Sequence, residues 1–301
     1  MISSTYLFIS ILSIAFTASA GSVKRAVTNL PANVKWDYQI GGAYAPDTSV
    51  GVVTRDRSST PVTEKYNICY INAFQTQPDN AAHAFWLNSE PSTASLGSSS
   101  VLITHCSTDS TRNALILRNS SNLPYEDKDW KGEYYFNTTT ADNRKALAEI
   151  VNGWIDECKS KGFNAIEPDN LENFARSSRL ITIDNNLDYA KLLAVHAHDL
   201  NLAIGQKNGG SELGSQGKDK AGFDFAIAEE CQKFNECNAY TNVYGNETLE
   251  VEYVDPDADD QGRSIFDAAC KARGSKISVI FRDVLVVPPG SDEEEYVYEE
   301  C

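Results

Sequence analysis

The sequence lacks the short motifs by which many metalloenzymes and nucleotide-binding enzymes are identified. It contains no HExxH, no CxxC pair and no GxGxxG or GxxxxGK[ST] loop. It also lacks GxSxG, the nucleophile elbow of many serine hydrolases. Of its four histidines, His196 and His198 form the one close pair, but side chains two residues apart on a helix diverge. We therefore expect a site that uses no metal and no cofactor.

Basic residues are also scarce. The chain has 26 Lys and Arg against 42 Asp and Glu, which gives a formal net charge of -16. A nucleic-acid partner requires a basic face, so the composition argues against one. An acidic surface instead attracts cationic ligands. Part of the charge lies near the carboxyl terminus, at 292–295 and 299–300, which we expect to be a solvated tail.

No apolar run is long enough to cross a membrane, which takes roughly 20 residues. The run Tyr6–Ala15 instead has the length of a signal-peptide core, and Ala18 and Ala20 form a cleavage site before Gly21. We expect a signal peptide at residues 1–20, a mature domain at 21–301, secretion to the extracellular space and no membrane partner. A buried amino-terminal helix is the alternative.

Seven cysteines are consistent with an oxidising compartment. Their number is odd, so at least one is unpaired within the chain. We expect Cys231 and Cys237 to close one loop and Cys301 to hold the carboxyl terminus. Glycosylation sequons, which are used only in secreted chains, lie at Asn119, Asn137 and Asn246.

Short apolar runs alternate with amphipathic stretches, which is typical of βα units. Several runs are apolar without alternation, as in strands that are covered on both faces. Apolar residues recur with helical spacing at 142–161, and a second helix is expected at 187–201. The expected strands are 34–40, 66–73, 163–166, 202–205, 223–227, 249–253 and 276–281.

These units occur without an internal repeat or a linker, which leaves two α/β architectures, a (β/α)8 barrel and a doubly wound sheet. Because no nucleotide-binding loop follows any strand, we predict the first. The predicted fold is a single-domain (β/α)8 TIM-type barrel with an insertion at residues 76–128. A Ser/Thr/Asn-rich stretch with two apolar bursts, 89–123, is expected to contain an extra hairpin.

Polar residues follow the expected strands at the point where each strand ends. In a barrel these ends meet at the active-site face. Glycoside hydrolysis needs carboxylates on different strands, one to protonate the leaving oxygen and one to attack the anomeric carbon or activate water. For Arg282 and Asp283 we favour a rim ion pair, and for Lys207 an ion pair and a site role both remain open. The other residues of this kind are Asp37, Asn72, Glu167, Asp169, Asn208, Glu229, Glu230, Glu252 and Tyr253.

Seven stretches match the pattern of one known family in order: WDYQIGG (36–42), YNICYINAFQ (66–75), GFNAIEPDN (162–170), AIGQKN (203–208), FDFAIAEEC (223–231), VEYV (251–254) and ISVIFRD (277–283). Together they resemble glycoside hydrolase family 114, the endo-α-1,4-polygalactosaminidases, including the fungal secreted members. The resemblance covers nearly the whole mature chain apart from 76–128. The IEPDN and FDFAIAEEC blocks are its most specific parts.

The resemblance implies a barrel that hydrolyses α-1,4-linked galactosamine polymers without a metal. It places the family's catalytic Asp at Asp169, as nucleophile, and its catalytic Glu at Glu229, as acid/base. The expected partner is a cationic, galactosamine-rich polysaccharide, which suits the acidic composition, and the expected state is a monomer. The expected substrate-binding residues are Asp37, Tyr44, Tyr70, Glu167, Lys207, Asn208, Glu252 and Tyr253.

The chain departs from the family pattern at three places. WxxExWLD becomes WKGEYYFN, with Asn137 in place of Asp, and DNVDGY becomes DNLENF, which introduces Glu172. Ala228 stands before Glu229, where Asn is common. We expect these changes at the rim of the cleft, where they would alter substrate choice or weaken activity. The alternative to an active enzyme is therefore a weakened barrel that serves as a carbohydrate-binding or wall-associated protein.

Overall fold

The computed structural model describes residues 27–87 and 110–301. Eight parallel strands in chain order form a nearly closed barrel, and a ninth strand pairs antiparallel with the eighth. The structure confirms the predicted TIM-type barrel in a single domain. The strands are β1 (Trp36–Gln39), β2 (Val52–Asp56), β3 (Tyr66–Asn72), β4 (Ala165–Asp169), β5 (Ala203–Lys207), β6 (Phe225–Glu229), β7 (Thr248–Tyr253), β8 (Ser278–Arg282) and β9 (Tyr298–Glu300).

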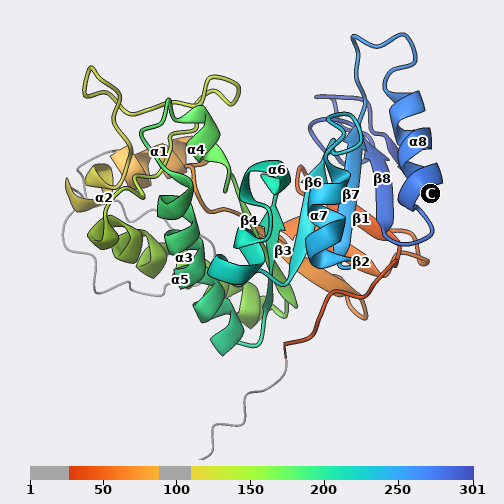
Figure 1. Cartoon of the computed structure of the whole chain (residues 1–301), viewed down its shortest axis with the longest axis horizontal. Coiled ribbons are helices and arrows are strands. Elements are labelled where there is room, and N and C mark those ends of the chain that lie inside the picture. The colour runs from red at the N-terminus through yellow and green to blue at the C-terminus, as the bar shows by residue number, and fades with distance from the viewer. Residues whose placement is uncertain (1–26, 88–109) are drawn as a thin grey trace, which may run out of the picture.

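Helices follow each of the strands from β3 to β7. Strands β1 and β2 lead instead into loops at 40–51 and 57–65. In Figure 1 the helices α1 to α5 gather on the left and α8 lies at the far right, beside β8. The helices are α1 (Asn80–Leu87), α2 (Ser110–Ala114), α3 (Ala141–Lys161), α4 (Asn173–Arg176), α5 (Ile183–Asp199), α6 (Gly210–Leu213), the π-helical turn η1 (Gly217–Ala221), α7 (Cys237–Tyr244) and α8 (Arg263–Arg273).

All seven expected strands are present, but β4, β5 and β6 continue two or three residues beyond their apolar runs. Most of the added residues, such as Glu167 and Lys207, are polar yet remain in the backbone ladder. Two strands were not predicted. In β2 the charged Arg55 and Asp56 interrupt a short β-branched run, and β9 belongs to the acidic end of the chain. The acidic end is therefore partly ordered, since 298–300 form a strand, although Glu299 remains exposed.

The two expected helices are confirmed, with shifted ends. In α3 the Thr140 side chain accepts a hydrogen bond from the Asn143 N–H, and Gly162 ends the helix with a φ of 100°. Helix α5 starts four residues earlier than its apolar pattern suggests, because Thr182 and Asn185 form a reciprocal capping box ahead of it. The capping residues therefore determine where both helices begin.

Side chains fill the barrel interior and connect the first strand, β1, to the last strands, β8 and β9. Apolar residues of successive strands, among them Trp36, Tyr38 and Phe225, form one buried cluster inside the barrel. The Tyr298 hydroxyl donates to the carbonyl of Trp36 at 3.0 Å, and the Arg282 guanidinium donates to the carbonyl of Tyr38. These contacts connect the β8–β9 edge to β1.

Three disulfides connect elements around the barrel. Cys69–Cys158 links β3 to α3, Cys231–Cys237 closes the loop after β6, and Cys270–Cys301 ties α8 to the carboxyl terminus. The second and third confirm the two roles predicted from the sequence. The seventh cysteine, Cys106, and the predicted signal peptide at 1–20 lie outside the described residues.

The segment between β3 and α3, which contains the predicted insertion at 76–128, holds α1, α2 and a set of isolated antiparallel bridges. One bridge, between Arg118 and Pro124, closes a turn, and Leu115, Ile116 and Leu117 are buried beside it. Most of the stretch 89–123, where an extra hairpin was expected, lies outside the described residues. Within 27–87 and 110–301, no helix combines the length and the apolar content that a membrane crossing requires.

Candidate active site

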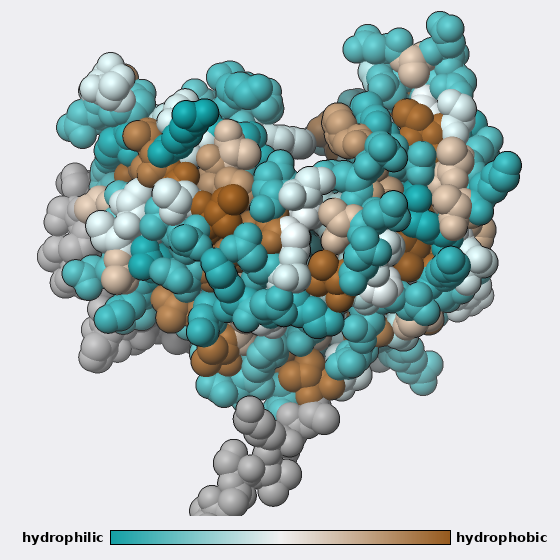
Figure 2. Space-filling model, in the orientation of Figure 1, coloured by the Kyte–Doolittle hydropathy of each residue, from teal (hydrophilic) through white to brown (hydrophobic). Residues whose placement is uncertain are grey.

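A cavity of about 530 Å³ lies at the carboxyl ends of the barrel strands. Figure 2 shows a mostly hydrophilic surface that is hollowed at its upper edge, between the α1–α4 side and the β7–α8 side. Six of the predicted site residues line the cavity: Tyr70, Asp169, Lys207, Asn208, Glu229 and Tyr253. The other lining residues include Asp56, Gln77, Trp130, Glu133, Asn170, Glu172, Arg176, Glu230, Val284 and Leu285.

Three consecutive strands carry the residues at the centre of the candidate site. Strands β4, β5 and β6 end on Asp169, Lys207 and Glu229. The residue after each of them has a positive φ, 67° at Asn170, 53° at Asn208 and 53° at Glu230. Left-handed backbone is uncommon outside glycine, and such positions cluster at functional sites. The chain thus turns sharply after each strand, and the last side chain of each strand remains at the mouth of the barrel.

The Lys207 ammonium lies at the centre of the carboxylates. This side chain is 1% exposed, and its Nζ lies 3.7 Å from Asp169 Oδ1, 3.2 Å from Glu229 Oε1 and 3.0 Å from Glu167 Oε1. Burial by itself lowers the pKa of Lys207, but the surrounding carboxylates raise it further, so the net shift is well upward. The ammonium therefore stays charged at neutral pH.

The same distances bound the separation of the two catalytic candidates. Asp169 Oδ1 and Glu229 Oε1 contact one nitrogen atom, so they lie no more than about 7 Å apart. Both side chains also keep partial solvent access, at 18% for Asp169 and 26% for Glu229. The pair is therefore close enough to act on one glycosidic bond.

Tyrosine and amide donors orient this pair. Tyr70 donates to Asp169 Oδ2 at 2.7 Å, and Tyr253 donates to Glu229 Oε1 at 2.6 Å. The Asn208 amide donates to Glu229 Oε2 at 2.7 Å and accepts the backbone N–H of the same glutamate. Burial raises the pKa of both tyrosines well above the usual value, so they remain donors.

Glu167 lies beneath the cavity and does not line it. It is fully buried and accepts hydrogen bonds at Oε1 from Tyr38, at 2.7 Å, and from Lys207, while its Oε2 has no partner. Burial is the main reason why its pKa rises to about 7, and the nearby Lys207 opposes that rise. This geometry makes Glu167 a residue that positions Lys207. Glu167 was predicted to bind substrate, but the structure places it below the cavity.

Three further predicted residues lie away from the cavity. Asp37 is buried and accepts hydrogen bonds from Tyr44, at 2.6 Å, and from Gln39, at 2.8 Å. Tyr44 lines a separate, shallower hollow. Glu252 lies on the outward face of β7, because side chains alternate along a strand and Val251 and Tyr253 face the barrel interior.

Sequence reasoning missed several residues of the cavity. Glu133 accepts hydrogen bonds at Oε2 from Asn72, at 2.8 Å, and from Gln75, at 3.1 Å. Its burial raises its pKa to about 7. Glu133 belongs to the WKGE segment, whose resemblance to the family motif was a usable signal. Asp56 was missed because its strand, β2, was missed.

The lining carries an excess of acid. Its carboxylates outnumber its cations, and one of the two cations, Arg176, is already bound to Glu172 at 2.6 Å and to Asp127 at 3.2 Å. The other is Lys207. The lining carboxylates are Asp56, Glu133, Asp169, Glu172, Glu229 and Glu230.

Of the three departures from the family pattern, Glu172 alone lines the cavity. Ala228 is buried in the cluster between the strands and the helices. Asn137 uses its side-chain oxygen to accept the Thr139 hydroxyl at 2.6 Å. The expectation that all three changes lie at the rim of the cleft is therefore wrong for Asn137 and Ala228.

Other charged side chains that the sequence singled out form ion pairs within the scaffold. Arg282 and Asp283 form the expected ion pair at 3.1 Å. His196 and His198 contact different carboxylates, those of Asp156 and Asp224, each at 2.9 Å, which agrees with the predicted divergence.

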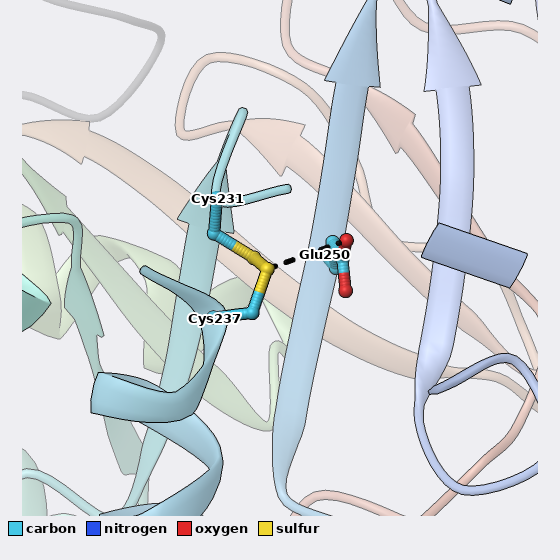
Figure 3. A group of neighbouring side chains, drawn as sticks. All are labelled: Cys231, Cys237 and Glu250. Carbon is cyan, nitrogen blue, oxygen red and sulfur yellow. Dashed lines mark hydrogen bonds between the residues drawn. A yellow bond between two sulfur atoms is a disulfide. The ribbon is translucent and has the colours of Figure 1, made fainter. Parts of the chain in front are cut away.

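Among the described residues, one cluster has the composition of a metal site: Cys231, Cys237 and Glu250. Figure 3 shows that its two sulfur atoms are joined in a disulfide, with Glu250 Oε1 at 3.7 Å from Cys237 Sγ. A disulfide sulfur is neither a thiolate ligand nor a hydrogen-bond donor. Glu250 is bound instead to Arg273, at 2.6 Å.

Comparison with known proteins agrees with this fold. A family model described as Glycoside-hydrolase family GH114 matches residues 17–301. The fold is similar to that of Aspergillus fumigatus Ega3, solved in complex with galactosamine, with a TM-score of 0.65, 19% identity and coverage of 93% of this chain and 100% of that one. It is also similar to the glycoside hydrolase domain of PelA from Pseudomonas aeruginosa, with a TM-score of 0.51, 12% identity and coverage of 86% and 97%. No curated protein sequence matches the chain.

Proposed function

Because the chain belongs to glycoside-hydrolase family GH114, we propose that it cleaves α-1,4-linked galactosamine polymers with retention of configuration, with Asp169 and Glu229 as the two catalytic carboxylates. The observation that carries the proposal is the shared contact of both carboxylates with Lys207. Retaining glycosidases hold their two carboxyl groups about 5–5.5 Å apart, whereas inverting enzymes need roughly 6.5–9.5 Å. The upper bound of about 7 Å, which applies to one oxygen of each carboxylate, is compatible with the retaining separation and reaches only the lower end of the inverting range, so it supports retention.

In the proposed first step, a carboxylate oxygen of Asp169 bonds to the anomeric carbon while the glycosidic C–O bond breaks. Protonated Glu229 gives its proton to the leaving oxygen. In the second step water attacks the anomeric carbon, gives a proton to Glu229, and the bond to Asp169 breaks. Esterification removes the charge of Asp169, so Lys207 then stabilises ionised Glu229 more strongly, as its role of base requires.

The proposed substrate follows from charge. A galactosamine unit carries an ammonium group, and the cavity presents six carboxylates against two cations, one of them already paired with Glu172 and Asp127. An anionic cleft raises the local concentration of such a chain. The galactosamine bound to Ega3 is of the same chemical class. An N-acetylated unit lacks this charge and should bind more weakly.

We further infer that the enzyme is secreted after cleavage behind residue 20 and acts as a monomer at internal bonds of the polymer. Three disulfides support an oxidising compartment. Endo action rests on the family resemblance, and the length distribution of early products tests it.

The decisive assay incubates the purified protein with deacetylated galactosaminogalactan and follows chain length by mass spectrometry. Shortened oligomers are expected, and proton NMR of the first products should show the α-anomer before mutarotation. An initial β-anomer would refute retention. The fully N-acetylated polymer is the matched substrate control and should be cleaved more slowly.

The alternative, a carbohydrate-binding barrel without activity, predicts a different result. Wild-type protein would bind the deacetylated polymer but release no oligomers. That outcome would refute the enzyme proposal for this substrate and favour the binding role.

A further inference from the structure

A second cavity, of about 480 Å³, adjoins the catalytic one. The two cavities share Asp56 and Gln77 among their lining residues. The second cavity is bounded by α1, α3 and the carboxyl ends of β2 and β3, on the side where β2 leads into a loop and not into a helix. Its volume falls within the roughly 300–1,000 Å³ that is typical of small-molecule sites.

A thin polar wall separates the cavities. Asn72 and Gln75 line the second cavity, and both donate to Oε2 of Glu133, which lines the catalytic cavity. Only one layer of hydrogen-bonded side chains therefore lies between the two spaces. The two shared residues, Asp56 and Gln77, mark where the cavities adjoin.

The cations of the second cavity are already engaged. Arg57 pairs with Glu157 at 3.1 Å and lies over the ring of Trp154, 4.7 Å from its centroid. Lys161 donates to the carbonyl of Arg57. Glu157 compensates the charge of Arg57, whereas Lys161 keeps its charge and directs it to a backbone carbonyl. The three carboxylates of the lining, Asp56, Asp79 and Glu157, still outnumber its two cations.

Two carboxylates of the cavity, in contrast, have no Lys or Arg partner among the described residues. Asp56 accepts the backbone N–H of Ser58 at 2.8 Å, and Asp79 accepts those of Ala81 and Ala82. In each case Oδ1 is used and Oδ2 is left for a ligand. The opposite wall is apolar, with Ala82, Phe85 and Trp86. An amino sugar has the matching pair of features, an ammonium group and a C–H face.

We propose that this cavity is a remote subsite that binds one further amino-sugar unit of the polymer whose scissile bond lies at Asp169 and Glu229. The ligand class rests on the proposed function. Binding energy that is gained away from the reacting bond can be used to position that bond. The enzyme should therefore prefer chains that are long enough to reach both cavities.

The test fills the second cavity and leaves the catalytic residues in place. Ala82→Trp puts an indole into the cavity, and Ala84→Trp makes the same change on the same helix at a residue that does not line it. The measured quantity is the ratio of kcat/KM for a long galactosamine polymer to that for the shortest cleaved oligomer. Ala82→Trp should lower this ratio about tenfold, the effect of roughly 1.4 kcal/mol, and Ala84→Trp should not change it.

A charge variant supplies a second measurement. Asp79→Asn keeps the oxygen that caps α1 but removes the charge, so it should lower the same ratio about threefold at low salt and less at high salt. An unchanged ratio in Ala82→Trp, or an equal fall in Ala84→Trp, would overturn the proposal.

Binding to Asp169→Asn protein separates the failure of this inference from the failure of the proposed function. Calorimetry should show that this variant prefers long over short galactosamine oligomers and that adding Ala82→Trp abolishes the preference. If wild-type protein cleaves nothing but the preference depends on Ala82, the subsite stands and the activity does not. If wild-type protein cleaves and the preference is unaffected, the activity stands and the subsite is refuted.

Discussion

Two clusters of charged residues lie at the carboxyl ends of the barrel strands, and they differ in access to solvent. The Lys207 cluster consists of Lys207, Glu167, Asp169 and Glu229, and two of its carboxylates face a cavity. The Arg282 cluster consists of Arg282, Asp283 and Asp37, and each of its side chains is at most 3% exposed.

The clusters also differ in how their charges are balanced. In the Arg282 cluster, Asp283 Oδ2 accepts the Val287 N–H at 2.6 Å and Oδ1 accepts the Val297 N–H at 3.1 Å, in addition to the guanidinium. The Lys207 cluster places three carboxylates on one cation. Buried carboxylates that hydrogen-bond donors surround, as they do Asp283 and Asp37, belong to the scaffold, whereas excess charge at a cavity remains available to a ligand. The position of a charge after a strand does not by itself reveal function.

The largest expected contrast is between Asp169→Asn and Asp37→Asn. Asp169→Asn removes the nucleophile and should lower kcat by at least about a thousandfold, with little change in melting temperature. Asp37→Asn should weaken hydrogen bonds of a buried carboxylate, lower the melting temperature, and change kcat less than tenfold where the protein is folded. Steady-state kinetics and thermal unfolding measure both. A thousandfold loss in Asp37→Asn with an unchanged melting temperature would place Asp37 in the active site.

The next contrast removes the cation from each cluster. Lys207→Met and Arg282→Met each leave buried carboxylates uncompensated, so each should lower the free energy of unfolding by about 3–5 kcal/mol in urea titrations. Adding Glu167→Gln to Lys207→Met should recover part of that stability, because Glu167 is then no longer an unpaired buried charge. Activity should not return with it. Recovery of activity would show that Lys207 acts only on stability.

The sequence identified most of the barrel because buried parallel strands are continuous apolar runs. It marked Asp169, Lys207 and Glu229 as candidates because each follows such a run, and the family resemblance then singled out Asp169 and Glu229. It failed at β2, where charged Arg55 is buried by its hydrogen bonds to Gln39 and to the carbonyls of Tyr44 and Thr60. That pairing depends on residues distant in the chain, which a local pattern does not contain.

The same limit explains the residues that were placed wrongly. Asp37 and Glu252 follow the expected pattern of polar residues in strands, but which face each one occupies depends on the register of β1 and β7. Glu133 lies between the predicted insertion and α3, far from any predicted strand end, and hydrogen bonds from Asn72 and Gln75 hold it at the cavity.

The smallest expected effect concerns Glu252. This residue lies on the outer face of β7, and its variant tests that face against the inner face, which lines the barrel interior. Glu252 is buried and accepts the Gln232 N–H at 2.8 Å, and burial raises its pKa from 4.5 to about 8. The native state therefore binds this proton more tightly than the unfolded state does. Stability from this group is present at low pH and is lost as pH rises from about 4.5 to about 8.

Glu252→Gln should remove that loss, because a neutral amide has no charge to desolvate. The variant should unfold with a free energy on the order of 2 kcal/mol above that of wild type at pH 9, and close to it at pH 4.5. Urea titrations at both pH values measure the difference, and Glu247→Gln, at a partly exposed glutamate that accepts a hydrogen bond from Asn29, is the matched control. Hydrolysis should stay within about twofold of wild type, since Glu252 does not line the cavity. A large loss of kcat with unchanged stability would instead return Glu252 to the substrate-binding residues that the sequence predicted.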